Sequence, residues 1–201
     1  MLILASQSPR RQALLREMGL SFTVRVSDVD ETPPAGATPQ EAAVAVALRK
    51  AQAVERTSQD VVIGADTTVL MPDGEVFGKP HSHEEAARML ESLSGRTHVV
   101  VTGMAVLRGS KVRTRAVETR VRFRKLTAQE IQAYIDTGEP FDKAGAYGVQ
   151  GKAAWLVDAI DGDYFNVVGL ALAPLGEMLR EMGFDIWKDG ESTCAGSGNP
   201  D

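Results

Sequence analysis

The first eleven residues constrain the fold most, because they place a buried strand directly before a helix. The apolar run from Leu2 to Ala5 predicts a short strand, and the residues after it have the apolar spacing of an amphipathic helix. Ser8 is a favoured N-cap residue, and Pro9 suits the first helical position, where a missing N–H is tolerated. The chain is therefore predicted to begin with a strand–helix unit.

Two arginines, Arg10 and Arg11, fall in the first turn of this helix, where the helix dipole favours acidic side chains. An anion in front of the helix removes that conflict. Together with free backbone N–H groups and the hydroxyls of Ser6 and Ser8, the two guanidinium groups predict a phosphate-binding site. A solvated basic helix start explains the same residues without a ligand.

Helical and strand patterns alternate along the rest of the chain and predict an α/β fold with a mixed, twisted central sheet flanked by helices. Strand patterns cover residues 22–26, 61–65, 97–107, 111–123 and 154–160, with a hairpin over residues 69–77. Helical patterns cover residues 42–53, 82–93, 127–137 and 166–182, with Thr38, Ser82 and Asn166 as expected caps.

Composition narrows the class of protein further. A chain of 201 residues with 43% hydrophobic residues suits one compact domain, expected over residues 1–187, with a polar and disordered tail over residues 188–201. The net charge of −5 argues against nucleic-acid binding, and no apolar run approaches the length of a membrane span. The single cysteine, Cys194, excludes an internal disulfide. We therefore expect a cytoplasmic protein without a nucleic-acid or membrane partner.

A carboxylate, Asp66, follows the most apolar predicted strand, residues 61–65. In open α/β sheets, ligands gather at the carboxyl ends of strands, where Asp66 is expected to lie. A carboxylate there can hold a divalent cation or accept a proton from an attacking water. A turn-capping aspartate is the structural alternative.

Three other charged residues are candidates for the same site. Glu31 lies in an acidic, proline-rich loop, and clustered carboxylates of this kind suit Mg²⁺, although solvated loop charges explain them too. Lys50 lies on or near the apolar border of a predicted helix, and Lys79 follows the predicted hairpin. Each lysine is either a phosphate ligand or an ordinary surface residue.

The glycine-rich stretch 145–151 is neither a dinucleotide fingerprint nor a Walker A loop. Its glycines let the backbone bend close to a ligand, and Gln150 offers both a donor and an acceptor to the edge of a base. A zinc site at His81 and His83 is disfavoured because no cysteine or third histidine lies nearby in the sequence.

Six motifs occur in the order found in one protein family: Ser6-Gln-Ser-Pro-Arg-Arg11, Gly64-Ala-Asp-Thr67, Gly78-Lys-Pro80, Ser94-Gly-Arg-Thr-His98, Glu139-Pro-Phe-Asp-Lys-Ala-Gly-Ala-Tyr-Gly-Val-Gln-Gly151 and Asn166-Val-Val-Gly-Leu170. On these motifs the chain closely resembles the Maf family of nucleoside triphosphate pyrophosphatases, from about Leu2 to Gly183. The resemblance implies an α/β fold like that of inosine triphosphatases, with a cleft between two lobes. It also implies cleavage between the α- and β-phosphates, a divalent metal such as Mg²⁺ or Mn²⁺, and a possible homodimer.

The resemblance assigns roles to individual residues as well. Asp66 matches the family's proton acceptor, and Arg11, Thr67 and Gln150 match the positions linked to base selectivity. Thr67 and Gln150 resemble the subgroup that acts on dTTP and UTP. Ala171 departs from the family pattern, which usually has proline between the two leucines.

The chemistry of these residues agrees with nucleotide hydrolysis. A triphosphate carries about four negative charges, which one Mg²⁺ and the cations Arg10, Arg11, Lys50 and Lys79 would offset. Asp66 is expected to direct water at the α-phosphorus, and Glu31 and Asp66 to hold the metal. Two other functions stay open: a house-cleaning pyrophosphatase for deaminated purine triphosphates, and a nucleotide-dependent regulator of cell division without essential turnover.

Overall fold

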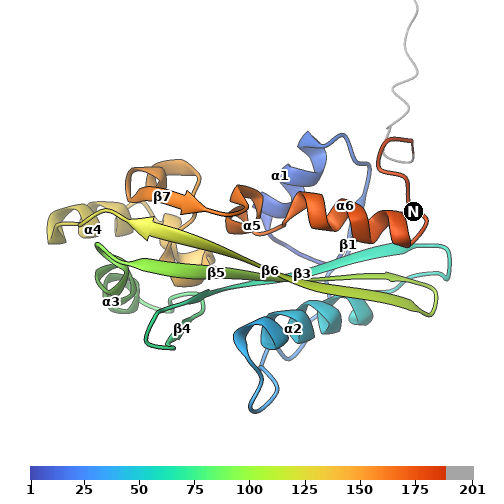
Figure 1. Cartoon of the computed structure of the whole chain (residues 1–201), viewed down its shortest axis with the longest axis horizontal. Coiled ribbons are helices and arrows are strands. Elements are labelled where there is room, and N and C mark those ends of the chain that lie inside the picture. Colours follow the sequence, from blue (N-terminus) through green and yellow to red (C-terminus); the bar gives the residue numbers. More distant parts are fainter. Residues whose placement is uncertain (189–201) are drawn as a thin grey trace, which may run out of the picture.

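The computed structural model describes residues 1–188, and their strands form one seven-stranded sheet in the order β2-β1-β3-β5-β6-β7, with β4 paired to β3 (Figure 1). β1 pairs in parallel with β2 and β3, whereas the pairs β3–β4, β3–β5, β5–β6 and β6–β7 are antiparallel. The predicted mixed sheet is therefore confirmed. The strands are β1 (Leu2–Leu4), β2 (Thr23–Val24), β3 (Val61–Leu70), β4 (Val76–Phe77), β5 (Thr97–Arg108), β6 (Lys111–Phe123) and β7 (Val157–Asp161).

Helices cover both faces of this sheet. α2 packs on one face, and α1, α5 and α6 lie on the other. α3 and α4 lie together at the end of the sheet where β5 begins and β6 ends (Figure 1). The helices are α1 (Pro9–Glu17), α2 (Pro39–Ala53), α3 (His83–Leu93), α4 (Ala128–Ile135), α5 (Tyr164–Val168) and α6 (Leu172–Glu181). No helix within residues 1–188 has the length and apolar character that a membrane span requires. The tail predicted over residues 188–201 lies outside the described residues, apart from Lys188.

Alternate residues of β3 point to the two faces of the sheet and join different apolar clusters. Val62 packs with Ala47 and Ala51 under α2, whereas Ile63 belongs to the larger cluster that includes Leu14 of α1. All five side chains are almost fully buried. Burial on both faces explains why the sequence of this strand is nearly continuous in apolar residues.

The pairing of β3 differs between its two edges. Along one edge, β5 pairs with every residue of the strand. Along the other edge, β1 pairs only with residues 61–63 and β4 only with residues 69–70. Among the described strands, none therefore covers residues 64–68 on this side, and the sheet has a gap between β1 and β4.

The predicted position of Asp66 at the end of a strand is wrong, because β3 continues to Leu70 and Asp66 lies in its middle. Asp66 pairs across the ladder with Gly103 of β5. The β-branched residues Thr67 and Thr68 after it favour extended backbone, and the full ladder with β5 stabilises it.

The C-terminal elements also differ from the prediction. Asn166 does not cap a helix, since it lies inside α5, and the side chain of Asp163 accepts the N-terminal N–H groups instead. Gly169, with φ +127°, separates α5 from α6, so the predicted single helix is two. Before β7, residues Gly151–Trp155 form a 3-10 helix rather than the start of a strand.

The caps predicted for α2 and α3 are present, in full at α2 and in part at α3. The capping box of Thr38 and Glu41 at α2 is present in full. At α3, Ser82 accepts the N–H of Glu85, but the Glu85 carboxylate accepts the N–H of His81 instead of completing the box.

Candidate active site

A cavity of about 1160 Å³ lies beside the gap in the sheet, along the uncovered edge of β3. Its walls come from the β1–α1 turn, the loop over residues 26–37, α2, β3, the segment after β4, the loop over residues 142–148 and the end of α5. The cavity brings together nearly all residues that the sequence pointed to: Ser6, Ser8, Arg10, Arg11, Glu31, Lys50, Asp66, Thr67 and Lys79. Because these residues come from distant parts of the chain, the fold itself assembles the site.

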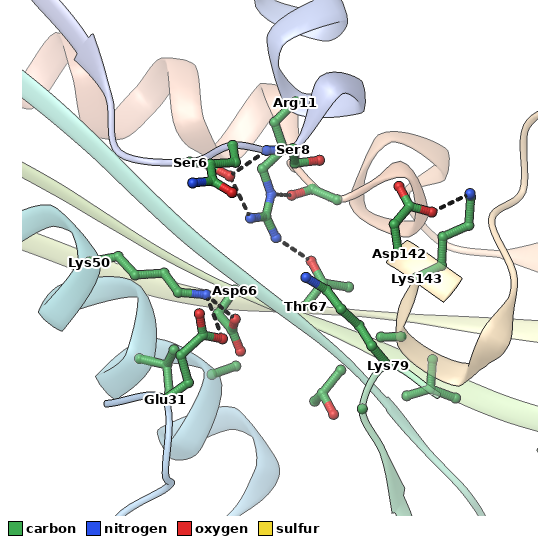
Figure 2. A pocket seen from close by; sticks show the side chains of 18 of the residues that line it. Ser6, Ser8, Arg11, Glu31, Lys50, Asp66, Thr67, Lys79, Asp142 and Lys143 are labelled. Atoms are coloured by element: carbon green, nitrogen blue, oxygen red, sulfur yellow. Dashed lines mark hydrogen bonds and ion pairs between the residues drawn. The ribbon is translucent and has the colours of Figure 1, made fainter. Parts of the chain in front are cut away.

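Asp66, Lys50 and Glu31 form a charged triad at one end of the cavity (Figure 2). The Lys50 Nζ lies 2.8 Å from Asp66 Oδ1 and 2.9 Å from Glu31 Oε2. Lys50 and Asp66 are partly buried, whereas Glu31 is exposed. One ammonium group thus holds two carboxylates that the sequence separates by 35 positions.

Two glycines bring Lys50 within reach of Asp66. A Cβ on Gly64 would lie 2.2 Å from the carbonyl oxygen of Ala47 in α2, and a Cβ on Gly103 would lie equally close to α2. Any larger residue at either position would therefore push α2 away from the sheet. Close packing of helix on strand, which only glycine permits here, sets the distance between the lysine and the carboxylate.

Glu31 and Asp66 are the predicted metal ligands, and both of their carboxylates face the same ammonium group. Within residues 1–188, no group of three or more acidic, histidine or cysteine side chains is placed to hold a metal ion. Mg²⁺ usually takes one or two carboxylates and completes its octahedron with waters and substrate phosphates. The pair therefore fits a divalent cation that arrives with a nucleotide.

The formal charges of the cavity wall cancel, because five cationic and five anionic side chains line it. They are Arg10, Arg11, Lys50, Lys79 and Lys143, facing Asp28, Glu31, Asp66, Glu85 and Asp142. A bound triphosphate, with about four negative charges, would give this neutral cavity a net negative charge. A bound metal or a rearrangement of ion pairs must then offset its charge, because the wall has no surplus of cations to do so.

Arg11 is buried and tied to the protein by most of its donors. Its Nε donates to Gly169 O at 2.8 Å, and its Nη1 donates to Ser6 Oγ at 3.1 Å and Ala65 O at 2.9 Å. Its Nη2 donates to Thr67 Oγ1 at 2.9 Å. Burial lowers the pKa of Arg11 and nearby Asp66 opposes this, but a guanidinium group stays protonated in proteins. Arg11 thus binds the uncovered edge of β3 to α1 and to the turn after α5.

The first turn of α1 has the predicted form, but not the predicted capping bond. Ser8 is the N-cap and Pro9 follows it, yet the Ser8 side chain makes no hydrogen bond to the helix. The N–H of Ser8 donates instead to Ser6 Oγ at 3.3 Å. Both hydroxyl side chains line the cavity.

Asp142 and Lys143 also line the cavity and were not predicted as site residues, although both lie in the motif that ends at Gly151. Asp142 accepts from Arg10 Nη1 at 2.9 Å and pairs with Lys143 Nζ at 2.6 Å. Burial raises the pKa of Asp142, but hydrogen bonds from Lys143 and Arg10 lower it by more, so the pKa lies below its ordinary value. The Asp-Lys pair just before the glycine-rich stretch was the available signal.

Gln150 lies outside the cavity lining. Its side chain is exposed, and the residue precedes the 3-10 helix Gly151–Trp155. The neighbouring Tyr147 and Gly148 do line the cavity. The backbone of the glycine-rich stretch therefore approaches the site as predicted, while the amide of Gln150 does not reach it in this conformation.

Tyr147 is anchored from behind by a buried histidine. Its hydroxyl lies 2.6 Å from His98 Nε2, and Phe123 packs edge-on against both rings. Burial lowers the pKa of His98 to about 4, so the ring is neutral near pH 7. The residue before Tyr147, Ala146, has φ 61°, a left-handed conformation that is costly without glycine. This wall of the cavity is thus held in a strained shape by packing.

A family model described as "Maf-like protein" matches residues 1–182. The chain belongs to the Maf family. A "dTTP/UTP pyrophosphatase" of Symbiobacterium thermophilum is 52% identical over 190 residues, covering 94% of this chain and 97% of the relative. One of Moorella thermoacetica is also 52% identical over 190 residues, covering 92% and 97%. The solved Ham1 protein of Staphylococcus aureus aligns with a TM-score of 0.50 at 15% identity over 90% of this chain and 98% of that chain, which shows the fold alone. These findings confirm the resemblance inferred from the six motifs.

Proposed function

We propose that this Maf family member is a nucleoside triphosphate pyrophosphatase that hydrolyses dTTP and UTP to the monophosphate and pyrophosphate. The observation that carries the proposal is one cavity in which the Asp66–Lys50 pair lies beside Arg11 and the start of α1. The relatives named dTTP/UTP pyrophosphatase, at 52% identity over almost the whole chain, support the choice of substrate.

In the proposed reaction, a water oxygen attacks the α-phosphorus. The bond between that phosphorus and the oxygen bridging to the β-phosphate breaks, and pyrophosphate leaves with the bonding electrons. Asp66 orients the water and accepts its proton. Lys50, fixed 2.8 Å from Asp66 Oδ1, holds this carboxylate in place. Stabilising the charge of the departing group is the main task of such a site.

We propose that Glu31 and Asp66 hold a divalent cation, Mg²⁺ or Mn²⁺, which when bound polarises phosphate oxygens and neutralises their charge. Lys50 faces both carboxylates and would share them with the cation as the nucleotide enters. The neutral wall of the cavity supports a need for this extra positive charge.

The phosphates are proposed to lie at the start of α1, against Ser6, Ser8, Arg10, Lys50 and Lys79. Arg11 has most of its donors committed inside the protein, so we assign it with Thr67 to the base. The role of Gln150 in base selection stays a prediction, and the dTTP-to-CTP preference of a Gln150→Ala variant decides it. A homodimer and a cytoplasmic location also stay predictions.

Pyrophosphate release from a panel of dTTP, UTP, CTP, ITP and XTP, with and without EDTA, tests the proposal. We expect metal-dependent turnover of dTTP and UTP. Preference for ITP and XTP would instead indicate a house-cleaning enzyme for deaminated purines. Activity that survives EDTA would contradict the proposed metal.

Asp66→Asn is expected to lower kcat by about a hundredfold or more, because a general base is lost without a change of shape. Asp158→Asn is the matched control, since Asp158 forms an exposed ion pair with Arg122 outside the cavity lining. If Asp66→Asn abolishes hydrolysis but preserves an effect on cell division, the protein acts as a nucleotide-dependent regulator. Near-normal turnover in this variant would refute the role of Asp66.

A further inference from the structure

Thr67 and Thr102 are directly opposed across the β3–β5 ladder, so their side chains point to the same face of the sheet. Their hydroxyl oxygens are 2.9 Å apart, and either atom could donate on distance alone. Thr67 lines the cavity, whereas Thr102 is fully buried behind it and outside the lining. The direction of this one hydrogen bond decides which group Thr67 offers to a ligand.

The neighbours of the two threonines settle the direction. Thr102 Oγ1 donates to the main-chain carbonyl oxygen of Asn166 at 3.1 Å, and a hydroxyl has a single proton. Thr102 therefore has no proton for Thr67, and Thr67 must donate to Thr102. On its other side, Thr67 Oγ1 accepts from Arg11 Nη2, which can only donate. The proton of Thr67 is thus directed into the protein, and only a lone pair is left for the cavity.

The residue that accepts the last of these hydrogen bonds, Asn166, is itself held rigidly. Asn166 is completely buried, and its Nδ2 donates to Val100 O at 3.1 Å and to Thr119 Oγ1 at 3.0 Å. Val100 lies on β5 and Thr119 on β6, so these two strands hold α5 in place. Because α5 is held in this way, the main-chain carbonyl of Asn166 stays opposite Thr102 Oγ1, and among the described residues the only other side-chain partner of that hydroxyl is Thr67.

One donor next to this lone pair remains available. Of the five N–H groups of Arg11, four have acceptors within the described residues, and the fifth is the second N–H of Nη2, beside Thr67. Gly169 lines the cavity at this point, and a Cβ there would lie 3.7 Å from Thr67 Oγ1 and 3.4 Å from Arg11 Nε. The glycine keeps a donor and an acceptor side by side and open to the cavity.

We propose that Thr102 is a specificity-determining positioning residue, which fixes Thr67 as a hydrogen-bond acceptor for the ring N3–H of uracil or thymine. The free N–H of Arg11 then pairs with an adjacent ring carbonyl. Cytosine has an unprotonated N3, which would meet the Thr67 lone pair and be repelled. This inference rests on the proposed function, since it concerns how the same site chooses among pyrimidine triphosphates.

The test compares Thr102→Val, which removes the hydroxyl at nearly constant shape, with Thr102→Ser, which keeps it. In Thr102→Val, the Thr67 hydroxyl can rotate and donate to N3 of cytosine. The ratio of kcat/KM for UTP to that for CTP is expected to fall by about tenfold, the usual cost of one unsatisfied buried polar group. Thr102→Ser should retain the wild-type ratio, and so should Thr97→Val, an exposed control on the same strand outside the cavity lining.

An equal loss on both substrates, or an unchanged ratio, would overturn the proposal and leave Thr102 a purely structural residue. Urea unfolding shows whether Thr102→Val is folded, and Thr102→Ala replaces it in the comparison if it is not. The wild-type enzyme is measured first. Failure to hydrolyse any pyrimidine triphosphate would refute the proposed function, whereas a UTP preference that Thr102→Val leaves intact refutes only this inference.

Discussion

Gly64→Ala tests whether the close packing of α2 positions the charged triad. The added Cβ would lie 2.2 Å from Ala47 O and 2.9 Å from the Cβ of Ala51, with Lys50 between these residues in the sequence. Carbon–oxygen contacts normally begin near about 3.3 Å, so α2 must move away by roughly 1 Å. The distance from Lys50 Nζ to Asp66 Oδ1, now 2.8 Å, would then grow to about 3.8 Å, which is too long for a hydrogen bond.

We expect Gly64→Ala to lower kcat/KM for every substrate by about a hundredfold, the effect of a misplacement of about 1 Å in a catalytic group. Overpacking of this kind should also lower the free energy of unfolding by about 1–3 kcal/mol. Pyrophosphate release and urea unfolding measure the two effects. Gly176→Ala in α6 is the control, because its Cβ would only touch the end of the Ile186 side chain at 3.4 Å. Wild-type turnover in a destabilised Gly64→Ala variant would refute the link between helix packing and catalysis.

Two further predictions concern the opposite wall of the cavity. Between pH 6.5 and about 4, unfolded His98 binds a proton that buried His98 refuses, so the free energy of unfolding should fall as the pH falls through this range. This pH-dependent loss in the free energy of unfolding, about 3 kcal/mol in total, should be missing in urea titrations of His98→Gln. Asp142→Asn removes a carboxylate between Arg10 and Lys143 and should lower the KM for UTP several-fold at low salt. The decrease in KM should vanish at high salt. A KM that rises instead would show that Asp142 mainly orients the two cations.

Local signals in the sequence predicted local structure well. The capping box at Thr38, the hairpin of β3 and β4 and the long ladder of β5 with β6 follow from neighbouring residues, and all three are present. The extension of β3 beyond Asp66 was missed because it depends on pairing with β5, about forty positions away. The burial of Asn166 was missed for the same reason, since its partners Val100 and Thr119 lie on distant strands.

The candidate site was found from chemistry, but its position follows from topology. The rule that ligands gather at the carboxyl ends of strands places the site after β1, where the chain leaves the sheet through Ser6. The same rule fails for β3, which runs on past the cavity. The carboxylate is accessible because β1 ends early and β4 begins late, which leaves this part of the β3 edge uncovered.

This arrangement divides catalysis and base selection between the two faces of one strand. Successive residues of β3 point to opposite faces, so Asp66 meets Lys50 on the α2 side while Thr67 meets Arg11 on the α1 side. Both stay within one cavity because the strand edge between them is uncovered. A change on the α2 side, such as Gly64→Ala, should therefore slow all substrates alike, and a change on the other side, such as Thr102→Val, should alter their ratio. If either variant produced the effect expected of the other, the two faces would not act separately, and the position of Asp66 next to Thr67 in the sequence would have no functional meaning.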